Sequence, residues 1–381
     1  MKRVLIIGML DSIHLYRWLS QFEDQQIDFT IYPSTKFRRV HAGTIKLVNS
    51  NKNYHFSQKK FLSLYGYKEY FFNNFLAKFS KSFSNSFRLN RIIMNNNYDY
   101  IHALEIQGAG YLLTDALQGK SDNNSKIIIT NWGSDIFFFE RDLAHKAKIQ
   151  DALKMADFYS AECHRDYELA LKNGFIGKFL PINPNAGGFS GEVLQKNVKP
   201  SSDRNIIVAK CYGGLFGLGD LIIQAVDEYM SLNRKVSVFF YSVTSDLEQK
   251  VNSLLVKYPS RINFSTVKNK LSILEMHEKF SNAKIYIGAS RSDGISTSFL
   301  EALVLGAYPI QTNTACGSEW VDKGFNAHLI QTSAEAIIEA LQEIDGLNNL
   351  EEMRLNNKNL AAKFLSFDSI KQDSLLFYGL K

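Results

Sequence analysis

The chain has 381 residues, of which 45% are hydrophobic and 22% charged, and its formal net charge is +6. This composition excludes collagen-like, coiled-coil and disordered proteins, and no apolar run reaches the roughly 18 residues that a membrane-spanning helix needs. The apolar start runs at once into Asp11 and His14 without a cleavage site, so we expect a buried strand there rather than a signal peptide. Three cysteines without CxxC spacing favour a reducing, cytoplasmic location and argue against disulfides and structural zinc.

Strand-like and helix-like segments alternate along the chain, a pattern typical of layered α/β domains. The first alternation predicts strands at 2–7, 29–32, 100–103, 126–130 and 158–161, with helices at 14–22, 111–117, 147–156 and 165–173. The second predicts strands at 205–209, 236–241, 262–264, 283–287 and 308–312, with helices at 220–230, 245–257, 273–280, 298–305 and 334–344.

The segment 181–205 separates the two alternations, because it has three prolines, three glycines and little periodicity. We therefore expect two Rossmann-like domains whose parallel sheets face a central cleft at the carboxyl ends of their strands. The predicted bounds are 1–185 for the first domain, 186–204 for the linker and 205–360 for the second domain. A last helix at 361–381 follows, and the spacing leaves open whether it returns to the first domain.

The segment 36–91 is strongly basic, with twelve Lys and Arg against one acid, Glu69, and it holds nine of the 28 phenylalanines. Phe72, Phe75, Phe79 and Phe83 recur in it at helical spacing. A basic helix with an aromatic stripe can bind an anionic membrane, but the same stripe can also pack inside its own domain. No nucleic-acid-binding motif accompanies the charge, so nucleic acid is not an expected partner.

The most informative stretch is 290–319, which follows a predicted strand and opens a helix. Free backbone N–H groups at such a helix start suit a diphosphate, and Arg291 is a candidate phosphate partner. Asp293 and Glu301 can accept hydrogen bonds from the hydroxyls of a sugar and a ribose. A purely structural reading is equally open at this point, with Ser298 as a helix cap, Glu301 as favourable first-turn charge and Asp293 as a turn former.

This stretch resembles the signature of the retaining family-4 glycosyltransferases of GT-B fold. Asp293-Gly294, Glu301-Ala302 and Gly306 with Pro309 and Ile310 fit that signature, although the family usually has Glu in place of Asp293. Further landmarks occur in the family's order, at Ile7-Gly8 with Ser12 and His14, Tyr98–His102, Thr130–Ile136, Ala156-Asp157, Asn183–Gly187, and Gly317 with Glu319.

Two departures from the family pattern stand out. Lys210 matches the first of the two basic residues that hold the diphosphate, but Leu215 or Phe216 takes the place of the second, and Arg291 is a candidate substitute. Trp132 stands where many relatives have a histidine near the acceptor hydroxyl.

The resemblance implies an enzyme, a retaining hexosyl- or glycosyltransferase. Its acceptor would be a lipid-linked glycan of bacterial-type surface polysaccharide synthesis, handled by the first domain, and its donor a nucleotide sugar, held by the second. The enzyme would be cytoplasmic and peripheral at the membrane, bound through 36–91. It would need no cofactor and no metal, in line with the absence of an Asp-x-Asp pair from the sequence. A nucleotide-sugar epimerase and an inactive GT-B binding module are the alternatives.

The resemblance also implies three sets of site residues. The implied catalytic residues are Asp293, Lys210, Arg291 and Asp135; the donor-binding residues are Gly8, Ser12, His14, Gly294, Ile295, Ser296, Thr297 and Glu301; and the acceptor-side residues are Asn131, Trp132 and His102.

Overall fold

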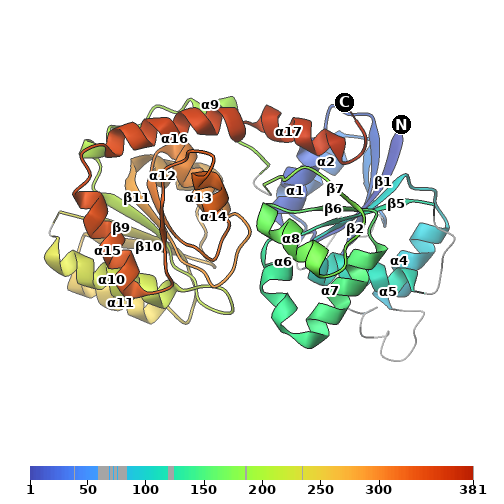
Figure 1. Cartoon of the computed structure of the whole chain (residues 1–381), viewed down its shortest axis with the longest axis horizontal. Helices are drawn as coiled ribbons and strands as arrows, with labels where there is room; N and C mark the ends of the chain where they lie inside the picture. The colour runs from blue at the N-terminus through green and yellow to red at the C-terminus, as the bar shows by residue number, and fades with distance from the viewer. Residues whose placement is uncertain are drawn as a thin grey trace. The chain divides into compact units, whose positions relative to one another are not determined.

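The chain divides into two compact units, each with helices on both faces of a parallel sheet (Figure 1). Unit 1 comprises 1–187 and 370–381, and unit 2 comprises 188–369. The expected fold class, two parallel-sheet α/β domains, is therefore confirmed. The computed structural model describes residues 1–37, 39–58, 68, 72, 75, 84–118, 124–184, 187–233 and 235–380.

The sheet of unit 1 has seven parallel strands in the order β3-β2-β1-β4-β5-β6-β7. The central strand β1 reads as a continuous apolar run because both of its faces are buried. Val4 and Ile6 enter the core on one face, and Leu5 and Ile7 enter the core on the other. The strands are β1 (Lys2–Gly8), β2 (Ile27–Pro33), β3 (Tyr54–Phe56), β4 (Tyr100–Leu104), β5 (Lys126–Thr130), β6 (Phe158–Ser160) and β7 (Lys178–Phe179).

The helices of unit 1 follow the strands as crossover connections. Most begin at a residue whose side chain accepts a hydrogen bond from the first turn, as Ser12 does for α1 and Asp142 for α7. They are α1 (Ile13–Ser20), α2 (Ala42–Ser50), α4 (Asn85–Met94), the π-helical turn η3 (Ile106–Gly110), α5 (Tyr111–Leu117), α6 (Ser134–Phe137), the 3₁₀ turn η4 (Phe139–Arg141), α7 (Leu143–Met155) and α8 (His164–Lys172).

Unit 2 has six parallel strands in the order β10-β9-β8-β11-β12-β13. They are β8 (Ile206–Lys210), β9 (Ser237–Val243), β10 (Ile262–Thr266), β11 (Ala283–Gly288), β12 (Tyr308–Thr312) and β13 (His328–Ile330). The helices are α9 (Gly191–Leu194), η5 (Ser201–Asp203), α10 (Gly219–Leu232), α11 (Glu248–Lys257), α12 (Ile273–Asn282), α13 (Thr297–Leu305), α14 (Gly317–Val321), α15 (Ala334–Asp345) and α16 (Leu350–Phe364).

Most of the segment expected as a linker is part of unit 2, from Gly188 onward. The guanidinium of Arg204, which is only 4% exposed, donates to the carbonyl oxygens of Lys199, Ala283 and Gly306. A buried cation that is saturated with carbonyl oxygens ties the irregular segment to the sheet and to the end of α13. The prolines, glycines and lack of periodicity in this segment therefore reflect an extended chain that is packed on unit 2.

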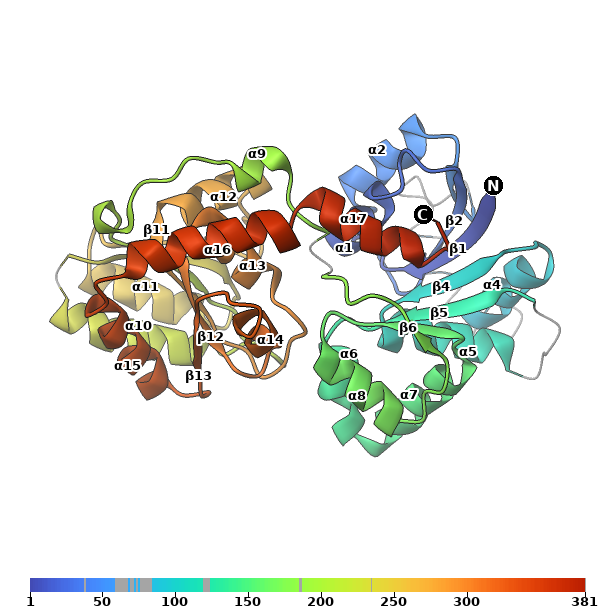
Figure 2. The same cartoon turned by 45° about the horizontal axis from the view of Figure 1, so that its top comes forward.

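The last helix, α17 (Phe367–Leu376), carries the chain into unit 1, where its end lies beside α1 (Figure 2). Tyr378 follows it and is fully buried among aromatic side chains. Its hydroxyl oxygen lies 3.0 Å from Trp18 Nε1, which donates to it, and 2.8 Å from His102 Nδ1. The C-terminal residues thus supply part of the core of unit 1.

No helix in the described part of the chain is long and apolar enough to cross a membrane.

We predict that Tyr378→Phe lowers the free energy of unfolding by about 1–3 kcal/mol, because it leaves the buried Trp18 N–H and a His102 ring nitrogen without a partner. Urea unfolding followed by fluorescence measures the change. Tyr100→Phe is the matched control, since Tyr100 packs on Tyr378 and its hydroxyl makes no hydrogen bond to a described residue. Equal small losses in both variants would contradict a role for the Tyr378 hydroxyl.

Candidate functional site

In unit 2, parallel pairing puts Lys210 and the start of the 289–296 loop at the same edge of the sheet. Lys210 is the last residue of β8, and it pairs in register with Gly288, the last residue of β11. The chain then leaves β8 into the glycine-rich 211–219 loop and leaves β11 toward α13. This edge is the place where α/β sheets bind ligands.

The two loops at this edge are joined by backbone pairing. The N–H of Arg291 donates to the carbonyl oxygen of Phe216 at 2.8 Å, and Gly217 forms an antiparallel bridge with Ser290. The structure thereby brings Arg291 to the loop that follows Lys210, and the Arg291 side chain is exposed. Its placement is compatible with the predicted role as a second phosphate partner.

The start of α13 presents backbone N–H groups that have no partner within the helix. The helix begins at Thr297, and its cap residue is Ser296, whose side chain makes no capping hydrogen bond. Ser298 therefore lies inside the helix, and the structural alternative in which it serves as the cap does not hold. Asp293 does shape a turn, because its Oδ1 accepts from the N–H of Gly294 at 2.9 Å.

Charged groups of opposite sign flank the phenol of Tyr212. The Lys210 ammonium lies 5.0 Å from the centroid of the Tyr212 ring. Burial and the negative charge of Asp293 raise the pKa of Tyr212. The Lys210 ammonium thus contacts the Tyr212 ring, and the charge of Asp293 acts on the Tyr212 phenol.

Glu301 lies one turn into α13 and faces His277 of α12. The distance from Glu301 Oε1 to His277 Nε2 is 3.9 Å, and both side chains are largely buried. The sequence analysis missed His277 as a neighbour of the site, because nothing in its local pattern separates it from a surface histidine of an amphipathic helix.

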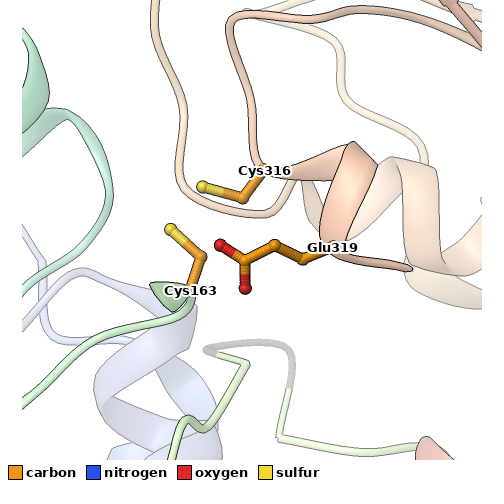
Figure 3. Close-up of side chains that lie close together, drawn as sticks. All are labelled: Cys163, Cys316 and Glu319. Carbon is orange, nitrogen blue, oxygen red and sulfur yellow. The ribbon is translucent and has the colours of Figure 1, made fainter. Parts of the chain in front are cut away.

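The loop before α14 is attached to the start of α13. The backbone N–H of Cys316 donates to the carbonyl oxygen of Gly294 at 2.7 Å. Figure 3 shows Cys316 just before α14 and Glu319 on its first turn. The landmark residues Gly317 and Glu319 are thus held against the loop that carries the predicted donor contacts.

In unit 1, the loop after β1 meets the loop after β5. Ser12 caps α1 by accepting the N–H of His14 at 3.1 Å, while Gly8 ends β1. The ring of His14 lies 5.3 Å, centroid to centroid, from the indole of Trp132. The structure therefore brings together the predicted donor residue His14 and the predicted acceptor-side residue Trp132.

Two polar atoms beside this pair are buried without a hydrogen-bond partner among the described residues. They are Oδ1 of Asn131 and Nε1 of Trp132. Asn131 has no exposed surface, and its Nδ2 donates to Asp166 Oδ2 at 2.7 Å. Burial raises the pKa of Asp166 to about 6, although Arg165 counteracts this. Unpaired buried polar atoms are rare in native proteins, and of those in the described part of this chain two belong to predicted acceptor-side residues.

His102, the third predicted acceptor-side residue, lies in the interior of unit 1 instead. It has no exposed surface, and its ring nitrogens lie 2.8 Å from the Tyr378 hydroxyl and 2.6 Å from Thr130 Oγ1. Burial lowers its pKa to about 3, so the imidazole is neutral. The structure does not bring His102 to the surface shared by His14 and Trp132. Its hydrogen bonds to Tyr378 and Thr130, in the interior of unit 1, are structural.

Asp135 is also buried, and it is partnered by backbone. Its Oδ2 accepts from the N–H of Ile106 at 2.9 Å and from that of Trp132 at 3.0 Å. Beside it lies a second buried carboxylate, Glu105, which the sequence analysis missed. The sequence signal that could have revealed Glu105 is an acid that directly follows an apolar strand and precedes Gly108 and Gly110.

Comparisons with known proteins support the fold. Residues 3–160 match the family model described as glycosyl transferase 4-like. Anabaena HepE in complex with UDP-glucose is 11% identical, with a TM-score of 0.68 and 99% of both chains covered. Sucrose-phosphate synthase from Thermosynechococcus elongatus is 12% identical, with a TM-score of 0.69 and coverage of 99% and 98%. A glycosyltransferase from Rickettsia africae is 14% identical, with a TM-score of 0.63 and coverage of 99% and 97%. A search of curated proteins finds no significant match.

The fold is therefore that of the GT-B glycosyltransferases. Within it, residues 3–160 are similar to the glycosyl transferase 4-like family.

We predict that Gly217→Ala weakens nucleotide binding at least tenfold. A Cβ at this position would lie closer than 3.0 Å to the carbonyl oxygens of Tyr212 and Gly213, so the 211–219 loop must move. Overpacking of this kind costs about 1–3 kcal/mol. Calorimetric titration with UDP checks the result against Gly191→Ala, where a Cβ meets nothing within 4 Å. Equal UDP affinity in both variants would show that the loop does not shape the nucleotide site.

Proposed function

We propose that the protein is a glycosyltransferase that transfers a sugar from a nucleotide-sugar donor to a lipid-linked glycan acceptor, with retention of configuration and without a metal ion. The observation that carries the proposal is the start of α13, whose first N–H groups have no partner within the helix. The loop that leads into α13 is hydrogen-bonded to the loop that follows Lys210. The acceptor would belong to bacterial-type surface polysaccharide synthesis, as the sequence resemblance implies.

The diphosphate of the donor is assigned to unit 2 because that is where positive charge and free amides meet. The leaving diphosphate gains negative charge as the sugar departs. Lys210, Arg291 and the amino end of α13 would stabilise that charge. Glu301 would accept hydrogen bonds from the ribose hydroxyls, with His277 at its side.

Retention follows if the acceptor attacks from the face that the diphosphate leaves. The bond between the anomeric carbon and the phosphate oxygen breaks, and its electron pair goes to the diphosphate. The acceptor oxygen forms the new bond, and its proton moves to the departing phosphate oxygen. No protein base is needed for this proton, and the sequence contains no Asp-x-Asp pair of the kind that holds a metal-bound diphosphate.

The direct test is transfer and hydrolysis across a panel of nucleotide sugars, beginning with UDP-glucose, the donor held by HepE. We predict that Glu301→Ala weakens binding of the accepted nucleotide by about 5- to 150-fold, because each lost carboxylate contact costs about 1–3 kcal/mol. Glu339→Ala is the matched control, since Glu339 is an exposed acid on α15 of the same unit.

Each other outcome of this test has a distinct meaning. Unchanged affinity in folded Glu301→Ala would remove Glu301 from the site. Conversion of the donor without an acceptor would indicate an epimerase. Nucleotide binding without turnover over a broad acceptor screen would indicate an inactive binding module, and a folded protein that binds no nucleotide sugar would contradict the whole proposal.

Attachment to the membrane is the second part of the proposal. The basic segment 36–91 carries a net charge of +11. In it, Phe72 and Phe75 are 58% and 51% exposed, which favours a membrane-facing aromatic surface over a stripe packed in the core. The other two residues of the stripe, Phe79 and Phe83, lie outside the described residues.

We predict that the protein binds anionic liposomes and that replacing Phe72 and Phe75 by Ser weakens this binding several-fold. Each Lys or Arg near such a surface contributes about 1 kcal/mol, and salt screens the attraction. Co-sedimentation with and without anionic lipid, at low and high salt, measures the effect. Leu143→Ser is the control, because Leu143 is 84% exposed in the same unit outside the basic segment. Equal, negligible binding to both kinds of liposome would rule out the attachment.

A further inference from the structure

His277 of α12 has a ring nitrogen, Nε2, that is shielded from solvent and has no hydrogen-bond partner among the described residues. The side chain as a whole is 10% exposed. Buried polar atoms without a partner are rare, because the free energy of their lost hydration is not recovered. This nitrogen therefore calls for a physical explanation.

The acceptor that faces the nitrogen is the carboxylate of Glu301 on α13. Glu301 Oε1 lies 3.9 Å from His277 Nε2, and the Glu301 side chain is 13% exposed. A hydrogen bond needs about 2.7–3.2 Å, so the two atoms must approach by about 1 Å to form one. Rotation about the side-chain torsions of Glu301 or His277 supplies a movement of this size without any change of the backbone.

The helix that carries His277 is fixed at both ends. At its start, Ser272 Oγ accepts the N–H of Glu275, and the Glu275 carboxylate accepts the N–H of Ser272 at 2.7 Å. On the turn after His277, Phe280 is fully buried and packs on the ring of Tyr286 of β11. The imidazole is therefore presented to Glu301 from a rigid element, which is the arrangement that holds a binding group precisely.

The charged residues that follow His277 on α12 have partners elsewhere. The carboxylate of Glu278 accepts from Lys196 Nζ at 2.8 Å. The ammonium of Lys279 lies 4.7 Å from the centroid of the Phe239 ring. These contacts direct both side chains to other groups, so the imidazole is the part of α12 that faces Glu301.

We propose that His277 is a positioning residue for nucleotide binding: its Nε2–H donates to Glu301 Oε1 and orients the carboxylate for the hydroxyls of the ribose. The inference deepens the proposed function and rests on it for the placement of the ribose at Glu301. An ionised carboxylate has about four acceptor positions on its two oxygens, so it can bind the imidazole and two hydroxyls together. His277 touches no atom of the nucleotide and acts through Glu301.

This role has a signature that a structural role lacks. A carboxylate that is already held in one orientation loses less conformational freedom when the ribose binds. Loss of His277 therefore weakens binding only of ligands whose hydroxyls contact Glu301. A general disturbance of unit 2 would instead weaken the binding of ribonucleotides and deoxyribonucleotides alike.

The experiment measures nucleotide affinity by calorimetry and needs no acceptor. UDP, GDP and ADP are tested first, and the one that binds is compared with its 2′-deoxy and 3′-deoxy analogues. We expect His277→Leu to weaken binding of the ribonucleotide about fivefold or more, since a hydrogen bond to a charged group is lost. His277→Gln keeps an N–H donor at the end of its side chain and restores most of the affinity.

The analogues and a second substitution show whether the effect passes through Glu301. We expect His277→Leu to change little for the analogue that lacks the contacted hydroxyl, and to add little to the loss in Glu301→Ala. His328→Leu is the matched control. His328 Nε2 lies 3.0 Å from Glu343 Oε2 in the same unit, but Glu343 belongs to α15, so we expect unchanged affinity.

Three results overturn the positioning role. They are an equal loss for the ribonucleotide and both analogues, a loss in His277→Gln as large as that in His277→Leu, and an undiminished further loss in the Glu301→Ala background. Urea unfolding of each variant checks that it is folded. If His277→Leu does not fold, His277→Phe, which keeps a flat ring without a donor, takes its place in every comparison.

The same measurements separate this inference from the proposed function. If the ribose-dependent effect of His277 is found but no nucleotide sugar is turned over, the proposed function fails and the positioning role in nucleotide binding stands. If transfer occurs and His277→Leu leaves affinity unchanged, the proposed function stands and the inference fails. If none of the three nucleotides binds, both are overturned.

Discussion

Parallel strand pairing is the constraint on which the rest of the structure depends. In a parallel sheet every strand ends at the same edge, so short loops from distant parts of the chain meet there. In unit 2 this brings Lys210 to the loops before α13, and in unit 1 it brings Gly8, Glu105 and Trp132 into neighbouring loops. The buried apolar strands carry no chemistry themselves. Their register decides which polar residues become neighbours.

The two edges differ in their electrostatics. At the edge of unit 2, a lysine, an exposed arginine and free amides favour an anion. At the edge of unit 1, three buried carboxylates, Glu105, Asp135 and Asp166, are satisfied mainly by backbone N–H groups, Asn131 and one arginine. A diphosphate is thus suited to unit 2 and a neutral, hydroxyl-rich molecule to unit 1. This division is consistent with a donor and an acceptor that are held by different units.

The fold, and the place in it of the residues proposed for the nucleotide, could be predicted from the sequence because their signals are local. The segment Asp293 to Glu301 lies between a strand and a helix within one continuous stretch, and its pattern needs no knowledge of distant residues. The residues that escaped prediction depend on tertiary contacts. The role of His102 is set by Tyr378, which is 276 positions away, and that of His277 by a different helix. The role of Glu105 depends on its hydrogen bonds to the N–H groups of Gly108 and Ala109, which no periodicity can report.

The return of the C-terminal segment to unit 1 has a consequence for how the protein is made. Phe377 and Tyr378 belong to the same core as Val4 and Ile6, so the ribosome must synthesise all of unit 2 before the core of unit 1 can close. Domains made first usually fold first, but unit 1 can complete its core only after unit 2 has been synthesised. During that interval Trp18 and His102 lack their phenol partner. The nascent first unit therefore exposes an incomplete aromatic core for the whole time that unit 2 is being translated, and that interval is when it is most open to chaperones and to aggregation.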